Sequence, residues 1–397
     1  MRFDFALPTE IVFGPGVLTQ LGERAASLGS RAFLVIGSGS LEKQGVVTRV
    51  ETMLREHGVS STRFASHGEP DTESVDRAAR VAHGEGSCLV IGLGGGSALD
   101  TAKAVACLLA NGGESLDYIE VVGRGQPIAK PSLPFIAIPS TGGTGSETTK
   151  NAVLTHRATR TKASLRSPHM MPRLALVDPE LSLSVPPAIT AATGLDALTQ
   201  LIEPYTSRRA QPMIDALAFG AMVHAARALP RAFATPDDLA ARSQLMYASM
   251  ISGIALAHAG LGAAHAFSGP LGGSFPVPHG FACAAVLPGV MATNLRRAAE
   301  TNASETVRRY ADVARALGAP SASEDFATAH DGIERVRDLC ARLQVPGLAA
   351  FGMTAADAPD IAERSRRTSS MRANPVDLSD SDLEAILLGA LGNHPSH

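Results

Sequence analysis

Short apolar runs alternate with helix-like segments over the first 180 residues, and this alternation constrains the fold more than any other feature of the sequence. Several of these runs end in glycine or serine, as buried strands often do. We expect strands at residues 32–36, 62–65, 88–93 and 135–138, and helices at residues 41–57, 74–83 and 98–109. Strands that alternate with helices predict a mostly parallel sheet covered on both faces.

The pattern changes near Asp178-Pro179, where long segments rich in Ala and Leu begin and β-branched runs almost disappear. We expect a helix opened by Pro186-Pro187, helices at residues 214–229 and 239–258, and a last helix from a capping box at 381–384 to about 391. A chain of 397 residues is also too long for one ordinary core. The sequence therefore predicts an α/β domain at residues 1–180 and an all-helical domain at residues 181–397.

Charge and hydropathy argue against several kinds of partner. The net charge is only −3 and no dense basic block is present, so we expect neither nucleic acid nor an anionic membrane as a partner. No apolar run approaches the roughly 20 residues of a membrane span, and the N-terminus lacks the pattern of a signal peptide, so we expect a cytoplasmic protein. The cysteines are expected to be buried thiols in a reducing compartment, without a thiolate metal site or a redox pair. They are Cys88, Cys107, Cys283 and Cys340.

Four small residues, Gly94, Gly95, Gly96 and Ser97, lie between a predicted strand and a predicted helix. In that setting, backbone N–H groups and the helix dipole can face an anion, and glycine permits its close approach. The alternative is a tight turn without a ligand. The spacing matches neither the dinucleotide fingerprint nor the Walker loop, so it predicts a phosphate site without naming the nucleotide.

A second polar loop, residues 139–149, follows the next expected strand and contains Thr141, Thr144 and Ser146. Ligands of open α/β sheets bind at the carboxyl ends of the strands, so two such loops suggest one nucleotide held twice. The alternative is a polar surface loop.

The first expected strand ends in Gly37-Ser38-Gly39-Ser40, where the ribose of an adenosine would be read. An acid there would accept from a 2′-hydroxyl and repel a 2′-phosphate, but the first acid is Glu42. This favours tolerance of NADP, although glycine also closes strands for structural reasons alone.

Asp196 and Gln200 lie four residues apart and would share one helix face. His265 and His279 follow in glycine-rich segments. Two imidazoles and a carboxylate can hold Zn²⁺ or Fe²⁺. A lone histidine in an apolar segment is more often a hydrogen-bonded core residue, so spacing alone leaves both interpretations open.

Taken together, these motifs resemble the iron-containing (group III) alcohol dehydrogenases of the dehydroquinate synthase-like superfamily. The matching stretches are residues 94–103, 139–149, 194–200, 260–273 and 278–280, and they occur in the family's order. The resemblance implies an N-terminal nucleotide-binding α/β domain, a C-terminal all-α domain, an active site in the cleft between them, and a homodimer or higher homo-oligomer. It implies hydride transfer between NAD(P) and an alcohol.

The resemblance also assigns residues. It implies that the turn from Gly94 to Ser97 holds the pyrophosphate and that Asp196, Gln200, His265 and His279 are the metal ligands, with Asp196, His265 and His279 catalytic. The further residues that it implies along the cofactor are Gly37, Ser38, Asp100, Thr141, Thr144, Ser146 and Lys162.

Two positions depart from the family pattern. The family usually has histidine where this chain has Gln200, and often a substrate-side histidine where it has Gly269. Gln200 could ligate weakly through its amide oxygen, water could replace it, or no metal binds and His265 or His279 polarises the carbonyl directly. His258 lies seven residues before His265 and would share its helix face, but about 10 Å away along the axis. We expect His258 to pack locally rather than to replace a ligand.

We therefore expect an oxidoreductase that transfers a hydride between NAD(P)(H) and a small alcohol, aldehyde or ketone, with Fe²⁺ or Zn²⁺ weakened by Gln200. Phe267, Gly269 and Phe275 suggest room for a substrate larger than ethanol. The alternatives are a metal-independent carbonyl reductase, a dehydroquinate synthase-like lyase, and a non-catalytic homologue that binds nucleotide.

Overall fold

The computed structural model describes residues 3–37, 39–159, 161–320 and 322–392, and the chain forms two compact units. The first unit is Ala6–Val185, and the second combines Pro186–His397 with Met1–Phe5. In the second unit the ring of Phe5 stacks on His258 with 4.4 Å between centroids. His258 Nδ1 also lies 2.7 Å from the carbonyl oxygen of Ile254, which is the local packing expected for this residue.

A six-stranded sheet forms the centre of the first unit, and all of its strand pairs are parallel. The strand order is β1-β8-β5-β4-β2-β3. The strands are β1 (Glu10–Phe13), β2 (Arg31–Ile36), β3 (Ser60–Ala65), β4 (Leu89–Gly94), β5 (Phe135–Pro139) and β8 (Leu174–Val177). The expected parallel sheet is confirmed. The two short strands β1 and β8 were not predicted, because four residues are too few to show a period.

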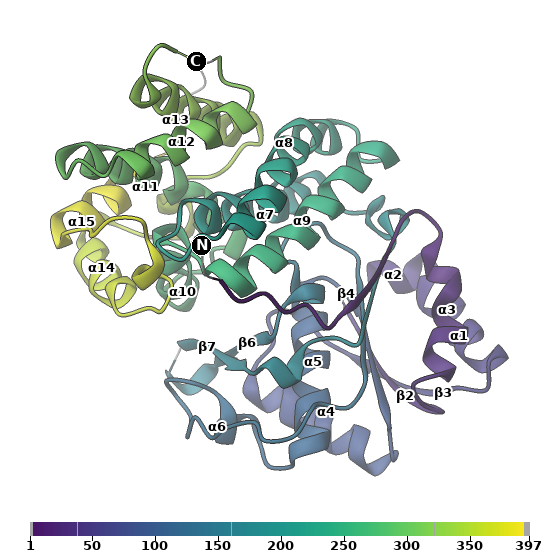
Figure 1. The fold of residues 1–397 in the computed structure, drawn as a ribbon. Helices are drawn as coiled ribbons and strands as arrows, with labels where there is room; N and C mark the ends of the chain where they lie inside the picture. The colour runs from purple at the N-terminus through teal and green to yellow at the C-terminus, as the bar shows by residue number, and fades with distance from the viewer. Residues whose placement is uncertain (1–2, 38, 160, 321, 393–397) are drawn as a thin grey trace. The chain divides into compact units, whose positions relative to one another are not determined.

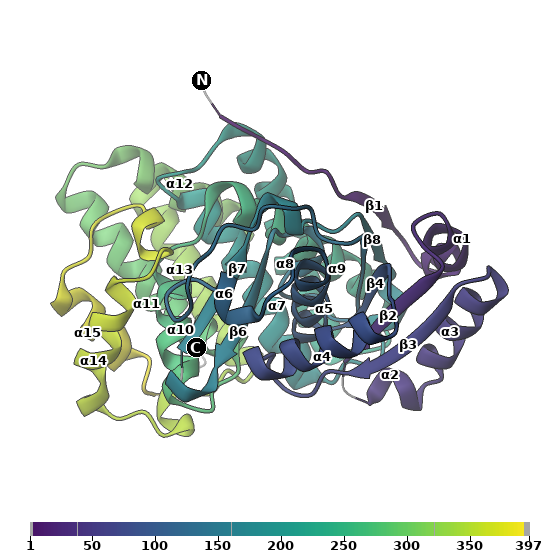
Figure 2. The same ribbon diagram turned by 90° about the horizontal axis from the view of Figure 1, so that it is seen from below.

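Helices cover both faces of this sheet (Figures 1 and 2), as expected. Phe33 and Val35 of β2 belong to the apolar cluster that includes the buried faces of α4 and α5. Leu34 and Ile36 belong to the cluster on the other face, with α1 and α3. The helices of this unit are α1 (Leu21–Ala26), α2 (Ser40–Lys43), α3 (Val46–Glu56), α4 (Thr72–Gly84), α5 (Gly96–Asn111) and α6 (Ser115–Tyr118).

Two details of the first unit differ from the sequence prediction. The single helix expected at 41–57 is two helices, because Gly45 adopts φ 74° between α2 and α3. An antiparallel hairpin of β6 (Asn151–His156) and β7 (Thr161–Arg166) was also missed.

Among the described residues of the second unit, all regular secondary structure is helical, which confirms the expected all-α half. Its helices are α7 (Pro187–Thr206), α8 (Pro212–Ala234), α9 (Leu239–Ala259), α10 (Ala263–Ser274), α11 (His279–Glu300), α12 (Ser304–Ala316), α13 (Asp325–Arg342), α14 (Ala358–Arg366) and α15 (Asp380–Gly389). Among the described residues, no single helix is long and apolar enough to cross a membrane; α9 and α10 pass that test only as a pair bent by 102°.

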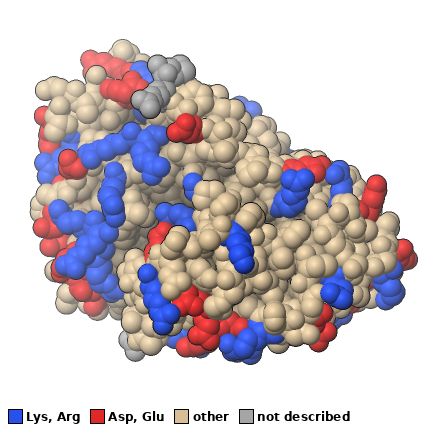
Figure 3. All heavy atoms as spheres, turned by 60° about the horizontal axis from the view of Figure 1, so that its bottom comes forward, with Lys and Arg blue, Asp and Glu red and all other residues tan. Residues whose placement is uncertain are grey.

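Charged side chains of both signs lie interspersed with uncharged ones on the face shown in Figure 3. Many arginines have an acid one helical turn away. Arg308 of α12, for example, lies 2.6 Å from Glu305 and 2.7 Å from Asp312. Such pairs neutralise charge locally and add little stability each.

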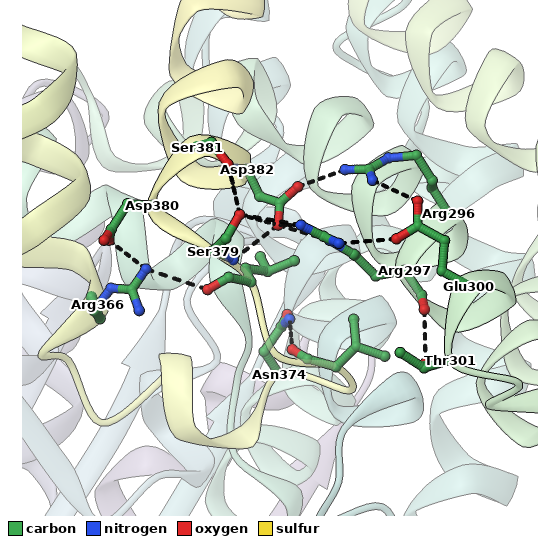
Figure 4. Close-up of polar contacts among 12 residues, drawn as sticks. Arg296, Arg297, Glu300, Thr301, Arg366, Asn374, Ser379, Asp380, Ser381 and Asp382 are labelled. Atoms are coloured by element: carbon green, nitrogen blue, oxygen red, sulfur yellow. Dashed lines mark hydrogen bonds and ion pairs between the residues drawn. The ribbon is translucent and has the colours of Figure 1, made fainter.

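The last helix is anchored to the end of α11 through Asp382 (Figure 4). The carboxylate of Asp382, 4% exposed, accepts from Arg296 at 2.5 Å and from Arg297 at 2.7 Å. Burial raises the pKa of Asp382, but the bonds from Arg297, Ser379 and Arg296 outweigh it and hold the pKa well below its usual value. The capping box consists of Ser379 and Asp382, so the helix begins earlier than residues 381–384 predicted.

Candidate functional site

Three neighbouring strands of the first unit end at the same level. The register pairs Ile36 of β2 with Leu93 of β4, and Gly94 of β4 with Pro139 of β5. Gly37 N donates to the Leu93 carbonyl at 2.9 Å, and the N–H of the residue after Pro139 donates to the Gly94 carbonyl at 2.9 Å. β2 and β4 are also where the strand order reverses direction, and such switch points form ligand crevices in open α/β sheets.

Gly94 cannot be replaced by a larger residue without strain. Its φ is 151°, and a Cβ there would lie 2.9 Å from the Cβ of Ala98 and 3.0 Å from the nitrogen of Gly37. The backbone of Gly37 and that of Gly94 are therefore in close contact, which places the predicted ribose-side loop against the glycine turn.

The glycine turn also contacts the second polar loop. A Cβ on Gly95 would lie 3.3 Å from Thr141 Oγ1, and one on Gly96 would lie 2.8 Å from Thr144 Oγ1. Gly95 is the N-cap of the 16-residue helix α5, whose first turn, which includes Ser97, carries no acid. Backbone N–H groups at a helix N-terminus and two hydroxyls at one place suit an anionic phosphate.

Asp100 and Ser146 join these two loops rather than standing free. Ser146 Oγ donates to Asp100 Oδ1 at 2.6 Å, and Val153 N donates to Asp100 Oδ2 at 2.9 Å. Lys103, which was not predicted as a site residue, is fully buried one turn further along α5. Its Nζ donates to the carbonyl and hydroxyl oxygens of Ser146 at 2.8 and 2.9 Å, and to Thr149 Oγ1 at 2.9 Å.

We call the contacts of Lys103 with Ser146 and Thr149, together with the nearby Glu147, the buried clamp. Burial has the largest effect on the pKa values of its two charged groups. It lowers the pKa of Lys103 to about 8 against the attraction of Asp100 and Glu147. It raises the pKa of Glu147, 2% exposed, to about 7. A lysine inside an otherwise apolar helix pattern was the available signal for this clamp, since a buried ammonium needs several acceptors.

Of the two remaining residues expected along the cofactor, Lys162 and Ser38, the structure describes only Lys162. Lys162 on β7 forms an ion pair with Glu69, with 2.5 Å between Nζ and Oε2. Ser38 lies outside the described residues.

A second cluster forms in the helical unit around one carboxylate. Asp196 Oδ1 lies 3.3 Å from His265 Nε2 and 3.6 Å from His279 Nε2. Asp196 comes from α7, His265 from α10 and His279 from the first residue of α11. Asp196 and His265 are buried, whereas the His279 side chain is 39% exposed.

Glycines allow the helices that carry this cluster to approach each other. A Cβ on Gly280 would lie 1.9 Å from the carbonyl oxygen of Ala192, so the start of α11 rests directly on the backbone of α7. A Cβ on Gly194 would lie 2.3 Å from Leu229 Cδ1, which fixes α7 against α8. The glycines next to Asp196 and His279 in the sequence are therefore packing requirements of the site.

Glu203 orients His265. Its Oε2 lies 2.6 Å from His265 Nδ1, and its Oε1 accepts from Ala264 N at 2.7 Å. Glu203 is 4% exposed and lies seven residues after Asp196, on the same face of α7. A carboxylate that accepts the Nδ1 proton leaves Nε2 free to face Asp196, as in metal-bound histidines. The sequence prediction missed this residue, although its spacing from Asp196 could have revealed it.

Opposite charges dominate the electrostatics of the cluster. Burial lowers the pKa of His265, but Cys283, Glu203 and Asp196 raise it well above its ordinary value. Burial raises the pKa of Asp196, and the charges of His279 and His265 bring it below its ordinary value.

Known proteins are similar to this chain over nearly its whole length. Family models described as "Iron-containing alcohol dehydrogenase" and "Fe-containing alcohol dehydrogenase family, C-terminal" match residues 8–179 and 190–391. A choline dehydrogenase of Bacillus subtilis (strain 168) is 35% identical over 384 residues, covering 95% of this chain and 92% of the relative. An NAD-dependent methanol dehydrogenase of Bacillus methanolicus is 32% identical over 391 residues, covering 98% and 100%. The solved structure of a 1,3-propanediol oxidoreductase matches with a TM-score of 0.91 and 31% identity, covering 98% and 100%.

The chain belongs to the iron-containing alcohol dehydrogenase family. The family resemblance, the fold class and the expectation of an alcohol-dehydrogenase-type oxidoreductase are thereby confirmed. The side chains of Asp196, His265 and His279 suit a metal ion. One carboxylate oxygen and two imidazole nitrogens around one point, with Nδ1 of one imidazole held by a carboxylate, form a donor set that fits a divalent cation.

Gln200 is buried next to Asp196. Its Nε2 donates to Asp196 Oδ2 at 3.0 Å, and its Oε1 has no hydrogen-bond partner among the described residues. The opposite amide orientation would place two oxygens against each other, so the ionised carboxylate selects this one.

Cys283 lies in the same cluster, which corrects the expectation that every cysteine is remote from a metal site. The donor atoms of Asp196, His265, His279 and Cys283 all lie within 4.8 Å of one another. Cys283 follows His279 by one turn of α11, so the i, i+4 spacing was the missed signal. Burial raises the pKa of its thiol, but the charges of His265 and His279 outweigh burial and lower it.

Gly269, where this family often has a histidine, faces open space: a Cβ there would meet nothing within 4 Å. Phe267 of α10 is fully buried. Phe275 ends α10 as its C-cap and is partly exposed.

Proposed function

We propose that this protein transfers a hydride between NAD(P)(H) and an alcohol or the corresponding aldehyde or ketone. The single observation that carries the proposal is the convergence of His265 and His279 on one oxygen of Asp196, in a chain of this family. Choline, methanol and propanediol in the names of its relatives or structural neighbours support an alcohol as the substrate class.

Each unit contributes a separate part of this function. In the first unit, Gly94, Gly95 and Gly96 would hold the pyrophosphate, with Thr141 and Thr144 as further donors. Lys103 fixes the two loops against each other through Ser146 and Thr149, so the cradle is formed before the nucleotide binds.

In the second unit, Asp196, His265 and His279 would hold a divalent metal, which supplies a Lewis acid for the alcohol or carbonyl oxygen. Glu203 keeps the proton of His265 on Nδ1 and thereby directs Nε2 into the cluster. The nicotinamide performs the hydride chemistry, and the protein aligns it.

We propose that the substrate is larger than ethanol and that carbonyl reduction with NADPH is accepted. The open space at Gly269 supports the first point. For the second, the first acid after β2, Glu42, is engaged by Arg63 at 2.8 Å, so it is poorly placed to repel a 2′-phosphate. Kinetics with NADPH and NADH on one aldehyde test this preference, and a strong preference for NADH would refute it.

The deciding experiment uses protein purified without chelator, with metal content measured beside turnover on a panel of primary alcohols and aldehydes. We expect nicotinamide turnover that falls on chelation and returns with added metal. No turnover on the panel, with nucleotide binding intact, would leave a non-catalytic nucleotide-binding homologue.

Full turnover in a metal-free preparation would favour a metal-independent carbonyl reductase. Gln200 is the observation that supports this second candidate, because it donates to Asp196 instead of offering a fourth imidazole. His265 and His279, whose pKa values are raised, would then donate hydrogen bonds to the carbonyl oxygen.

A lyase of the dehydroquinate synthase kind fits less well. Its acidic substrate needs basic side chains, but Arg157 is held by Asp71 at 2.7 Å and Lys162 by Glu69 at 2.5 Å. We further propose a cytoplasmic homodimer or higher homo-oligomer, which light scattering of the purified protein would test.

A further inference from the structure

Position 200 has a different chemical role from that of a metal ligand. The amide nitrogen of Gln200 donates a hydrogen bond to Asp196 Oδ2. This carboxylate oxygen is therefore engaged by a residue of the same helix. The other oxygen, Oδ1, is the one that faces His265 and His279. Gln200 therefore orients the carboxylate rather than completing the donor set.

Cys283 offers the cluster a fourth donor atom, its sulfur. It is fully buried, and its sulfur lies 4.0 Å from His279 Nε2. Its side chain joins the cluster from α11, on the same face as His279.

The distances agree with a four-donor set. Tetrahedral zinc, with bonds of about 2.0–2.3 Å to oxygen, nitrogen and sulfur, separates its donor atoms by roughly 3.3–3.8 Å. The observed separations are 3.3 Å, 3.6 Å and 4.0 Å for the contacts of Asp196 with His265, of Asp196 with His279, and of His279 with Cys283. No donor pair exceeds 4.8 Å, so small side-chain movements close the set.

We propose that Cys283 is the fourth metal ligand of this chain, in place of Gln200, and that the resulting oxygen, two-nitrogen and sulfur set selects Zn²⁺ over Fe²⁺. Thiolate is a soft ligand and favours Zn²⁺, which imidazole also binds well. A set of nitrogen and oxygen donors alone favours Zn²⁺ over Fe²⁺ less strongly. The inference rests on the proposed function in that it fills the same site, but it concerns the identity of the ligands and of the metal.

The test loads the full-length protein with Co²⁺, a spectroscopic substitute for zinc. A thiolate ligand gives a sulfur-to-cobalt charge-transfer band in the near ultraviolet, which oxygen and nitrogen ligands do not. We expect this band in the wild type, its loss in Cys283→Ser, and its retention in Cys340→Ser. Cys340 is the matched control because it is equally buried but lies on α13, with its sulfur 3.7 Å from the carbonyl oxygen of Ala284.

Two further measurements separate the ligands. Competition between Zn²⁺ and Fe²⁺ under anaerobic conditions should show that Cys283→Ser weakens zinc binding by about 10- to 100-fold or more, and iron binding by less. Gln200→Ala should keep the cobalt band and bind one metal per chain. Loss of metal in Gln200→Ala with an unchanged Cys283→Ser would overturn the proposal.

Failure to bind Co²⁺, or a cobalt spectrum without the sulfur band in wild-type protein, would also overturn it. These results are independent of turnover. A protein that shows the band but oxidises no alcohol refutes the proposed function alone, and one that turns over without the band refutes only the role of Cys283.

Discussion

The two candidate sites of this molecule are built from different materials. In the first unit, the proposed anion-binding surface consists of backbone at the ends of β2 and β4, where Gly37, Gly94 and Gly95 lie. In the second unit, the cluster consists of side chains from three helices, gathered around Asp196. A site made of backbone depends on where chain conformation permits close approach. A site made of side chains depends on which helix faces meet.

This difference has a consequence for mutation. In the first site, we expect the addition of a single methyl group to weaken nucleotide binding, because a Cβ would meet neighbouring atoms closely. In the second, changing one donor atom should cause damage without any change in shape. The two sites should therefore be separable, one by binding of nucleotide and the other by binding of metal.

The largest effect is expected for Asp196→Asn. The change keeps the shape but removes the charge that both histidines face, and a metal that acts as a Lewis acid contributes several kcal/mol to such a reaction. We expect turnover to fall by about 10³-fold while the Kd for NADPH stays unchanged, as measured by nicotinamide absorbance and by calorimetry. Glu363→Gln, on the exposed side of α14, is the control. Nearly normal turnover in Asp196→Asn would show that the second site is not the reacting one.

Gly94→Ala should have the opposite profile. The φ of 151° and the close contact with Gly37 predict a cost of about 1–3 kcal/mol in this loop. We expect the Kd for NADPH to rise by about 10- to 100-fold, with metal content unchanged.

Gly84→Ala in α4 is the control, because a Cβ there meets nothing within 4 Å. If both variants bound nucleotide like the wild type, the glycine turn would be a structural turn and the comparison between the two sites would fail.

Glu203→Gln tests how a side-chain site is held in place. The amide can still accept one hydrogen bond, but it no longer carries the charge that holds the Nδ1 proton of His265. Loss of such an outer partner lowers metal affinity by about 10- to 100-fold. A metal titration with a competing chelator measures this, and nucleotide affinity should not change. Unaltered metal affinity would mean that packing alone positions His265.

The smallest effect is expected from the buried clamp of the first unit. Glu147 has a pKa of about 7 in the folded protein, raised by burial from 4.5. Between these values the folded state retains a proton that the unfolded state has lost, so stability falls as the pH rises from 4.5 to 7.

Glu147→Gln cannot lose that proton. Its stability relative to wild type should therefore improve with pH over the same window, by on the order of 1–2 kcal/mol, in urea unfolding at several pH values. A constant difference across the window would show that Glu147 is already ionised in the folded state.

Sequence patterns predicted the parallel sheet and the main helices of the helical half. Buried strands and buried helix faces each place apolar residues in a recognisable pattern along the chain. The strand at 135–138 became β5, and the segment 239–258 became α9, each within about two residues. The break at Gly45 and the hairpin of β6 and β7 were missed, since a local glycine conformation and a short polar strand leave little mark on hydropathy.

The sequence by itself determined where glycines must lie and which residues can act as donors, because these depend on local conformation and on residue type. Only the tertiary structure decided which donors meet. It turned Gln200 toward Asp196, placed Glu203 behind His265, brought Cys283 into the cluster, and closed Lys103 onto the neighbouring loop. In the helical unit these contacts join residues up to 87 positions apart, from Asp196 to Cys283 (283 − 196). They depend on the close packing of α7 at Gly194 and Gly280, which spacing along a single helix does not specify.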